Sequence, residues 1–235
     1  MIKWFFSLFI FLILPSVTWA DSDIAISPVS LEITANEPIV TLNVKNNADN
    51  TTTIQADVMQ WSQKNGQVVL YPTDDMVISP PLFQIGPWQT QIVRVAWLSP
   101  HPVNEQLMYR VLLREISKIN FSLLPSHRSG LNFRLNISLP VFVQPDTQNP
   151  AYRWQMHWVD AHTLHLILAN TGNVSLMVSE LKLSRENQAV FSENTFEYVL
   201  PKQAYTWVLK VKHHDFNTVN AVVNGEWESS SAFVH

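Results

Sequence analysis

One long alternation of apolar and polar residues constrains this chain more than any other feature. The stretch "GLNFRLNISLPVFVQP" at 130–145 carries an apolar side chain at every second position: Leu131, Phe133, Leu135, Ile137, Leu139, Val141 and Val143. A period of two is typical of a β-strand with one apolar face. Strands usually have about five or six residues. The pattern therefore predicts an apolar ribbon that is longer than an ordinary strand, and it raises the question of what covers it.

The first twenty residues predict that the chain is exported. Lys3 precedes an apolar run from Trp4 to Leu14, and Pro15 and Ala20 follow it. This three-part layout is typical of a secretory signal at 1–20 that is cleaved after Ala20. The run is shorter than the roughly 20 apolar residues of a membrane-spanning helix, although an uncleaved anchor is the alternative. No other segment is long and apolar enough to span a bilayer, so no membrane insertion is expected after signal removal.

The cysteine content and the net charge limit the cellular compartments and the classes of partner that can be expected for this protein. The chain has no cysteine, so an exported protein of this sequence must rely on buried cores and not on disulfides. Together with the signal, this favours a bacterial periplasm or surface. The net charge is −4, and removal of Lys3 with the signal leaves 14 basic and 19 acidic residues, or −5. Because the basic residues form no stripe, no nucleic acid is expected as a partner.

Short alternating segments recur along the rest of the chain and predict an all-β fold. They lie at 38–47, 53–61, 90–97, 106–116, 152–159, 163–173, 175–183 and 205–212. Turn-forming residues separate the earlier ones at 64–66, 79–81 and 99–104. Many short strands at a spacing of about ten residues predict an antiparallel sandwich.

A break in this pattern predicts two domains. The segment "VQPDTQNPAY" at 143–152 holds two prolines, an aspartate and an asparagine, as an interdomain linker would. About 215 mature residues are enough for two domains of ordinary size. We therefore predict β-sandwich domains at 21–144 and 150–235, joined by a linker at 145–149.

Five segments in a fixed order resemble the periplasmic chaperones of the chaperone–usher pathway, the PapD-like proteins that help to build pili. They are "TLNVKNN", "ISPPLFQIGPWQTQIVRV" at 78–95, "YRVLLREI" at 109–116, "LNFRLNISLPVFVQP", and "LANTGNVSLMVSELKL" at 168–183. The second is the most specific, since it joins a Pro-Pro pair, a Gly-Pro turn and an Arg-bearing strand. The resemblance implies two immunoglobulin-like β-sandwich domains set at an angle.

The resemblance also implies which kind of protein covers the long apolar ribbon. Pilus subunits lack their last strand, and the chaperone inserts its own strand into the open groove. Carried over to this chain, Leu131, Phe133, Leu135 and Ile137 would enter the groove, whereas Leu139, Val141 and Val143 would belong to the core of the first domain. The alternative is that all seven side chains face that core. The loop at 117–130 is expected to become ordered only when a subunit binds.

Three positions depart from the pattern of the best-known chaperones. Those proteins hold the subunit's C-terminal carboxylate with an Arg on the first strand and a Lys near the end of the donated strand. Ser30 and Pro140 stand at the matching positions here, and neither carries a charge. Gln144 replaces the Arg that often precedes the linker proline, so an ionic contact between the domains is in doubt. These departures resemble the archaic or alternative branch of the family; the other interpretation is a copy that binds subunits poorly.

A carboxylate in a partly dry cleft still needs a cation, preferably the fork of donors of an arginine. Arg134 lies on the polar side of the donated strand, and Arg110 lies in the neighbouring strand. Both are candidate carboxylate anchors. The alternative for both is a solvated sheet face or an ion pair with Glu115. Arg94 matches a position that the family keeps, and we expect it to have a structural role in the first sheet.

The sequence offers no pattern that predicts catalysis or a metal site. His162 and His165 would diverge in a strand, as would His213 and His214, and no cysteine or carboxylate stands at ligand spacing. No nucleophile elbow and no Gly-rich phosphate loop is present. We therefore expect no metal, no cofactor and no enzymatic activity.

The function predicted from the sequence is that of a periplasmic chaperone. Its expected partners are a pilus or fimbrial subunit, which it would bind by strand donation, and an outer-membrane usher, to which it would deliver the subunit. The alternative is an exported immunoglobulin-like adhesin or binding module in which the strand at 131–143 is ordinary core; an enzyme is the third possibility.

Overall fold

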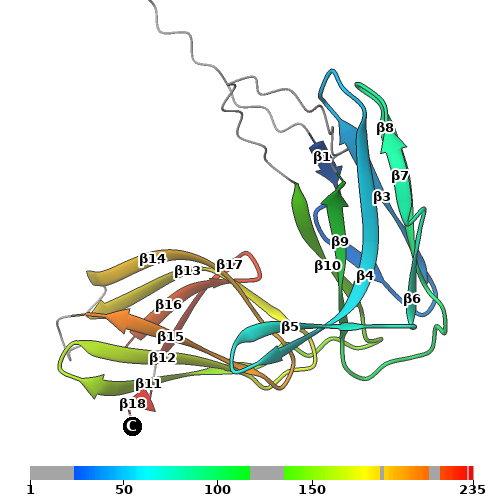
Figure 1. Cartoon of the computed structure of the whole chain (residues 1–235). Coiled ribbons are helices and arrows are strands. Elements are labelled where there is room, and N and C mark those ends of the chain that lie inside the picture. Colours follow the sequence, from blue (N-terminus) through cyan, green and yellow to red (C-terminus); the bar gives the residue numbers. More distant parts are fainter. Residues whose placement is uncertain (1–23, 117–134, 186–187, 212–217, 232, 235) are drawn as a thin grey trace, which may run out of the picture.

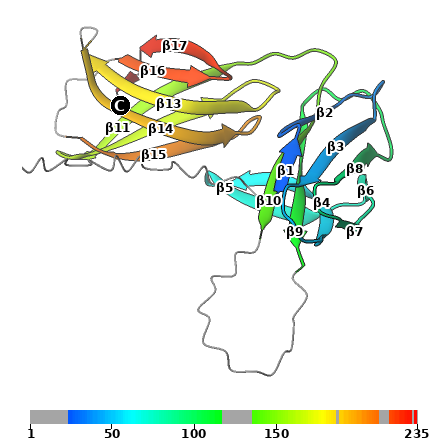
Figure 2. The same cartoon turned by 90° about the horizontal axis from the view of Figure 1, so that it is seen from above.

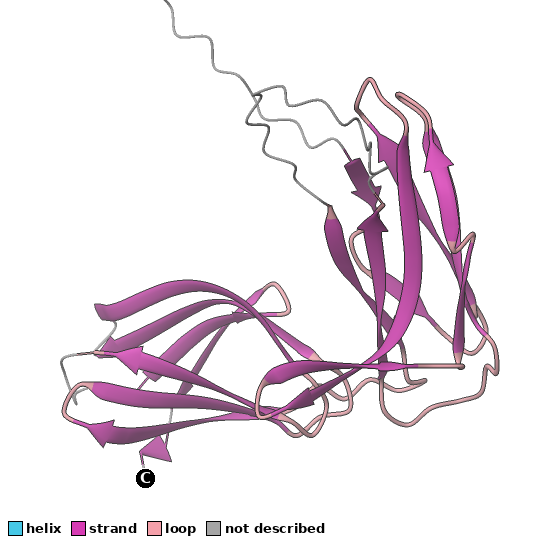
Figure 3. Ribbon diagram, viewed as in Figure 1, coloured by secondary structure: helices cyan, strands magenta, loops and turns pink. Residues whose placement is uncertain are grey.

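The computed structural model describes residues 24–116, 135–185, 188–211, 218–231 and 233–234. The predicted signal at 1–20 and the loop at 117–130 lie outside these residues. All regular structure in the described part is β-strand (Figure 3). No helix in that part is long and apolar enough to cross a membrane.

The first half of the chain forms two sheets. One has the order β1-β3-β8-β6, with β1 (Ile24–Ser27), β3 (Ile39–Asn46), β8 (Thr90–Trp97) and β6 (Met76–Ser79). The other has the order β2-β10-β9-β4-β5, with β2 (Leu31–Ile33), β10 (Asn136–Val143), β9 (Leu107–Glu115), β4 (Thr52–Lys64) and β5 (Gln67–Pro72). A short strand, β7 (Leu82–Ile85), pairs with the first residues of β4.

Alternation along these strands creates the first core. In β3, Leu42 and Val44 are buried while Asn43 and Lys45 are exposed, as expected for a sheet with one covered face. The two sheets pack these faces together into a cluster of twenty buried residues that runs from Ile24 to Val143 in sequence. No disulfide is needed, because burial of this apolar surface stabilises the domain.

The second half of the chain repeats this architecture. Its sheets have the orders β15-β12-β11-β18 and β14-β13-β16-β17. The strands are β11 (Tyr152–Asp160), β12 (Thr163–Asn170), β13 (Leu176–Arg185), β14 (Gln188–Val199), β15 (Ala204–Lys210), β16 (Thr218–Val223), β17 (Glu226–Ser231) and β18 (Phe233–Val234). A separate core extends from Trp154 to Val223.

The prediction of an all-β chain with two sandwich domains set at an angle is confirmed (Figure 1). The linker boundaries at 145–149 stay a prediction, which agrees with the position of the two cores. The strands pair antiparallel, as predicted, except in two places, where β10 pairs with β2 and β11 pairs with β18 in parallel. In both cases a short strand completes the edge of a sheet.

The strand predicted at 53–61 is longer in the structure. As β4 it continues to Lys64, and it returns through Asn65 and Gly66 into β5. Both turn residues have positive φ angles, 52° and 77°, which Asn and Gly tolerate best in a two-residue hairpin turn. The hairpin extends from the first domain toward the second (Figures 1 and 2). An added Cβ at Gly66 would lie 3.1 Å from the ring of Tyr205, so the hairpin tip touches the second domain.

Candidate functional site

Strand β10 carries the apolar stripe that the sequence predicts. Leu139, Val141 and Val143 are buried in the first core, which confirms the expectation for these three. Leu135 and Ile137 are half-buried and pack against the same core. Leu131, Phe133 and Arg134 lie outside the described residues. Along the described part of the stripe, the apolar side chains therefore change from buried at Leu139–Val143 to half-buried at Leu135 and Ile137.

Within the described residues, one edge of β10 is paired over only part of its length. The whole strand pairs with β9 on one side, whereas on the other side β2 pairs only with the last three residues, Val141 to Val143. Within the described residues, no strand pairs with 136–140 on that side. This stretch therefore offers unpaired backbone groups, which can form hydrogen bonds with an additional strand.

Arg110 lies on the sheet face that is turned away from the first core, next to Pro140, one of the two positions that the sequence resemblance matched to a charged anchor. Arg110 lies directly opposite Pro140 on β10 and Met59 on β4. Leu31 is paired in register with Val141, so Ser30, the preceding residue, aligns with Pro140. Arg110 and Pro140 are thus neighbours on adjacent strands, and Ser30 directly precedes β2, the strand that pairs with β10 next to Pro140.

Two aromatic rings hold the Arg110 side chain. Its guanidinium carbon lies 3.8 Å from the ring centre of Trp61, on β4, and 5.7 Å from that of Tyr198, on β14 of the second domain. Burial lowers the pKa of Arg110, and the interaction with Tyr198 partly opposes this effect. Cation–π contacts of a partly desolvated arginine are favourable by about 1–2 kcal/mol. Arg110 is therefore neither on a solvated face nor paired with Glu115, the two alternatives considered for it.

The same corner has donors without acceptors. The buried Nε of Arg110 and the Nε1 of Trp61 have no hydrogen-bond partner within the described part of the chain. Trp61 is only 2% exposed. An unsatisfied buried donor is unusual and costs about 1–3 kcal/mol. An acceptor that enters this corner would find two unpaired N–H groups and a positive charge.

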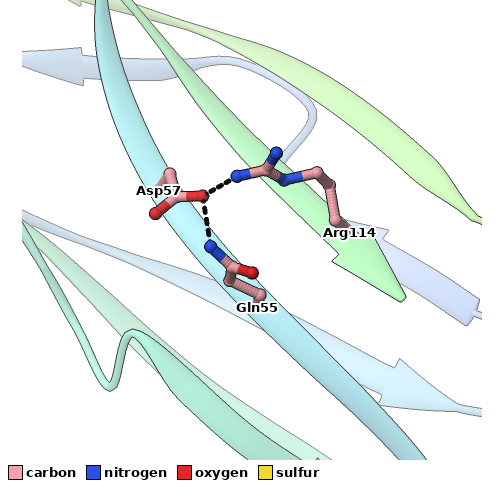
Figure 4. Close-up of polar contacts among 3 residues, drawn as sticks. All are labelled: Gln55, Asp57 and Arg114. Carbon is pink, nitrogen blue, oxygen red and sulfur yellow. Dashed lines mark hydrogen bonds and ion pairs between the residues drawn. The ribbon is translucent and has the colours of Figure 1, made fainter. Parts of the chain in front are cut away.

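A different arginine forms the ion pair on this face. Arg114, four residues further along β9, pairs with Asp57 on β4, and the Nε2 of Gln55 donates a 2.9 Å hydrogen bond to the same carboxylate oxygen (Figure 4). The charge of Arg114 is thus already compensated by Asp57, so Arg110 is a better candidate for the carboxylate anchor than Arg114.

The corner between the domains is filled by apolar and aromatic side chains. Trp61, Phe142 and Leu200 are buried there, with Leu70, Met108 and Tyr198 packed against them. Gln63 of β4 reaches into the second domain, where its Nε2 donates to the Tyr198 carbonyl and its Oε1 accepts a 2.9 Å hydrogen bond from the Leu200 N–H. The cluster and Gln63 hold the two domains together beside Arg110.

Arg94 lies apart from this corner. It is exposed on β8, on the outer face of the other sheet, opposite Thr41 and Ser79. Its expected structural role stays a prediction. The residues that sequence reasoning missed are Trp61 and Tyr198. Residue parity places Trp61 on the same face of its strand as Met59, but nothing in the sequence links Tyr198 of the second domain to Arg110.

Comparisons with known proteins identify the family. The model of the pili and flagellar-assembly chaperone family, PapD N-terminal domain, matches residues 23–149, more than half of the chain. The chain belongs to this family. No curated protein sequence matches it significantly. Family members of this chaperone–usher type are periplasmic, which agrees with the predicted signal.

Solved structures of the family's chaperones share the fold. The complex of CsuC with the tip adhesion subunit CsuE, from archaic Csu pili of Acinetobacter baumannii, matches with a TM-score of 0.70 and 19% identity over 91% of this chain and 100% of that one. The Salmonella enterica complex of the pilin SafA with the SafB chaperone matches with a TM-score of 0.62 and 15% identity, covering 88% and 95%. The E. coli chaperone DraB gives 0.59 and 16%, covering 90% and 96%.

Proposed function

We propose that this protein is a periplasmic chaperone that binds one pilus or fimbrial subunit by donating the strand at 131–137, and that it delivers the subunit to an outer-membrane usher. Family membership supports this function over that of an adhesin, a binding module or an enzyme. CsuC and SafB are both described in complexes with a pilus subunit. The observation that carries the proposal is the apolar stripe of β10, which leaves the first core beside an open strand edge.

The physical basis of subunit binding is strand addition. The open edge at 136–140 would supply backbone hydrogen bonds, and Leu131, Phe133, Leu135 and Ile137 would fill the groove of the subunit. Each fully buried side chain of this size stabilises a complex by about 1.5–3 kcal/mol. Leu135 and Ile137 are already half-buried in the free chain, so their share is smaller. Leu131 and Phe133 would therefore contribute most of the apolar affinity.

Arg110 is the proposed anchor for the carboxylate at the subunit's C-terminus. It lies directly opposite Pro140, and Ser30 directly precedes the strand that pairs with β10 next to Pro140; the sequence resemblance matches these two uncharged positions to the charged anchors of the best-known relatives. The unsatisfied Nε of Arg110 and Nε1 of Trp61 would gain an acceptor when a carboxylate binds. Arg134 stays a second candidate from the sequence. A relocated anchor would agree with the divergent archaic or alternative branch of the family that the sequence suggested.

A pull-down of the tagged protein from its native periplasm tests the function. We expect a small β-rich subunit at near-equimolar ratio, identified by mass spectrometry. Aspartate at both Phe133 and Leu135 should abolish its capture because two charges would enter an apolar groove. The matched control places aspartate at Val159 and Val190, two exposed apolar residues of the second domain, and should capture the subunit normally. A double variant at Phe133 and Leu135 that unfolds at a much lower temperature would instead assign these residues to the core.

The anchor has its own test. Arg110→Gln should weaken binding of the captured subunit by at least tenfold, whereas Arg114→Gln, on the same face of the same strand, should change it much less. Amidation removes the negative charge of the subunit's C-terminus. The amidated subunit should therefore bind the wild-type chaperone as weakly as the unmodified subunit binds the Arg110→Gln variant. Equal loss in both arginine variants would contradict Arg110 as the anchor without contradicting strand donation.

A further inference from the structure

Two histidines lie side by side on the outer face of the second domain. His157 on β11 and His165 on β12 are register partners in an antiparallel pair. Their ring centres are 6.4 Å apart, with an angle of 57° between the ring planes. Side chains directly opposite each other in such a pair have Cβ atoms about 4.5–5.5 Å apart, so both imidazoles start from neighbouring points and extend the same way.

The burial pattern directs this pair away from the core. On β12, Leu164 and Leu166 flank His165 and are fully buried; on β11, Met156 is buried and His157 is exposed. The next strand of the same sheet places Val208 opposite His165, and Val208 is 59% exposed. The two imidazoles therefore lie on a solvent-accessible face of the sheet.

We propose that His157 and His165 bind one divalent transition-metal ion, of the Cu²⁺, Ni²⁺ or Zn²⁺ class. A metal–imidazole nitrogen bond is about 2.0–2.1 Å. Adding the roughly 1 Å from ring centre to nitrogen, two imidazoles that bind one ion at the tetrahedral angle have ring centres about 5 Å apart. The observed distance between the ring centres is 6.4 Å, so side-chain rotation must bring the two rings closer before both can bind one ion.

The ligand set determines the kind of ion. Neutral imidazole suits copper, nickel and zinc and not magnesium or calcium. Within the described residues, no group of three or more histidines, cysteines and carboxylates could hold a metal. The pair thus supplies two protein ligands, and water completes the coordination. Affinity should follow the Irving–Williams order, with Cu²⁺ bound more tightly than Ni²⁺ or Zn²⁺.

This site was not predicted from the sequence, because the sequence analysis compared only histidines that are close along the chain. It compared His165 with His162, which is three residues away. In the structure, His162 lies in the turn between β11 and β12, while the partner of His165 is eight residues away, on the other strand of the hairpin. A bound ion would therefore link the two strands of this hairpin.

Titration of NiCl₂ into the untagged protein at pH 7.5, followed by calorimetry, tests the site. We expect one ion per chain, with affinity reduced at least tenfold in both His157→Ala and His165→Ala. His162→Ala is the matched control and should bind as wild type does. The EPR spectrum of one equivalent of Cu²⁺ should show coupling to two imidazole nitrogens in wild type and to fewer in each of the two site variants.

Thermal unfolding adds a readout that does not depend on calorimetry. NiCl₂ should raise the melting temperature of wild type and His162→Ala, because an ion that binds only the folded state stabilises it, and should not raise that of either site variant. MgCl₂ should have no such effect on any of them. The proposal is overturned if the His157 and His165 variants retain wild-type affinity for Ni²⁺, or if His162→Ala loses affinity as they do. Either result leaves the chaperone function untouched.

Discussion

The side-chain amide of Gln106 donates a 2.9 Å hydrogen bond to the side-chain oxygen of Gln144, where the first domain meets the linker. The other end of Gln106 crosses to the second domain, since its Oε1 accepts a 2.8 Å hydrogen bond from the N–H of Ser175. The backbone N–H of Gln106 also donates to the carbonyl of Asn173, at 2.8 Å. This connection between the domains is built from neutral amides, in place of the ionic contact that the sequence resemblance put in doubt.

A neutral connection predicts that the domain angle is insensitive to salt. Raising NaCl from about 0.1 M to 1 M shortens the Debye length from about 10 Å to 3 Å, which weakens ion pairs but not amide hydrogen bonds. Small-angle X-ray scattering of the free protein should give the same radius of gyration at both concentrations. A variant with both Gln106→Glu and Gln144→Arg places opposite charges there and should become salt-sensitive. A salt-dependent change in wild type would contradict a neutral joint.

Removing the Gln106 side chain should loosen the two domains. Gln106 is only 5% exposed, and Gln106→Ala leaves the Ser175 N–H without its acceptor. Ser175 is half-buried, so the loss of this acceptor should cost about 1 kcal/mol, the lower end of the cost of an unsatisfied donor, and chemical denaturation should report this loss in the free energy of unfolding. The control is Gln84→Ala, at an exposed position on β7, which should change stability by less than about 0.5 kcal/mol. Equal effects of the two changes would show that the Gln106 contacts contribute little.

Gly66 and Gly225 have similar backbone conformations but different surroundings. Comparing substitutions at the two positions therefore distinguishes the cost of backbone strain from the cost of a steric contact. Gly66 and Gly225 have φ angles of 77° and 87°, where a side chain costs about 1–2 kcal/mol. An added Cβ at Gly225 meets nothing within 4 Å, whereas at Gly66 it lies 3.1 Å from the ring of Tyr205. Gly66→Ala should therefore destabilise the protein more than Gly225→Ala, as measured by chemical denaturation.

The excess cost at Gly66 should depend on the second domain. In a Tyr205→Ala background the ring is gone, so Gly66→Ala and Gly225→Ala should cost the same. If the excess persists in that background, the hairpin tip does not touch the second domain at Tyr205.

The sequence predicted features that depend on local periodicity. Val141 and Val143 fall on the buried side of β10, and Thr90–Trp97 forms β8 at the predicted bounds. Alternation is a property of neighbouring residues, so it survives in any sheet that buries one face. The open edge at 136–140 was not predictable in this way, because it depends on how few residues of β2 pair with β10.

Contacts between the domains could not be predicted from the sequence either, because they do not depend on local periodicity. Arg110 was recognised as a candidate anchor from its strand and its charge. Its contact with Tyr198 depends on the angle between two domains, and no periodicity encodes that angle. The same holds for His157 and His165, whose pairing depends on the register of one hairpin.

Tyr109 predicts how stability responds to alkaline pH. Its side chain is 1% exposed and its hydroxyl donates a 3.0 Å hydrogen bond to Asp75. Burial, and then this bond and the Asp75 charge, raise the pKa of Tyr109 above its ordinary value of 10. Because the unfolded chain loses this proton near pH 10 while the folded protein keeps it, the contribution to stability is complete below pH 10. It is lost as pH rises above 10, by up to about 1.4 kcal/mol per pH unit.

Urea denaturation of wild type and Tyr109→Phe between pH 8 and 11 tests this. Below pH 10 the variant should be less stable by about 1–3 kcal/mol, because it lacks a hydrogen bond to a charged acceptor. Above pH 10 the two curves should converge, since phenylalanine has no proton to lose. Burial also raises the pKa of Tyr198, so the difference between the proteins is the informative quantity. Tyr71→Phe, at an exposed position on β5, is the control and should stay parallel to wild type. If Tyr109→Phe also stays parallel, Tyr109 does not contribute to the alkaline loss of stability.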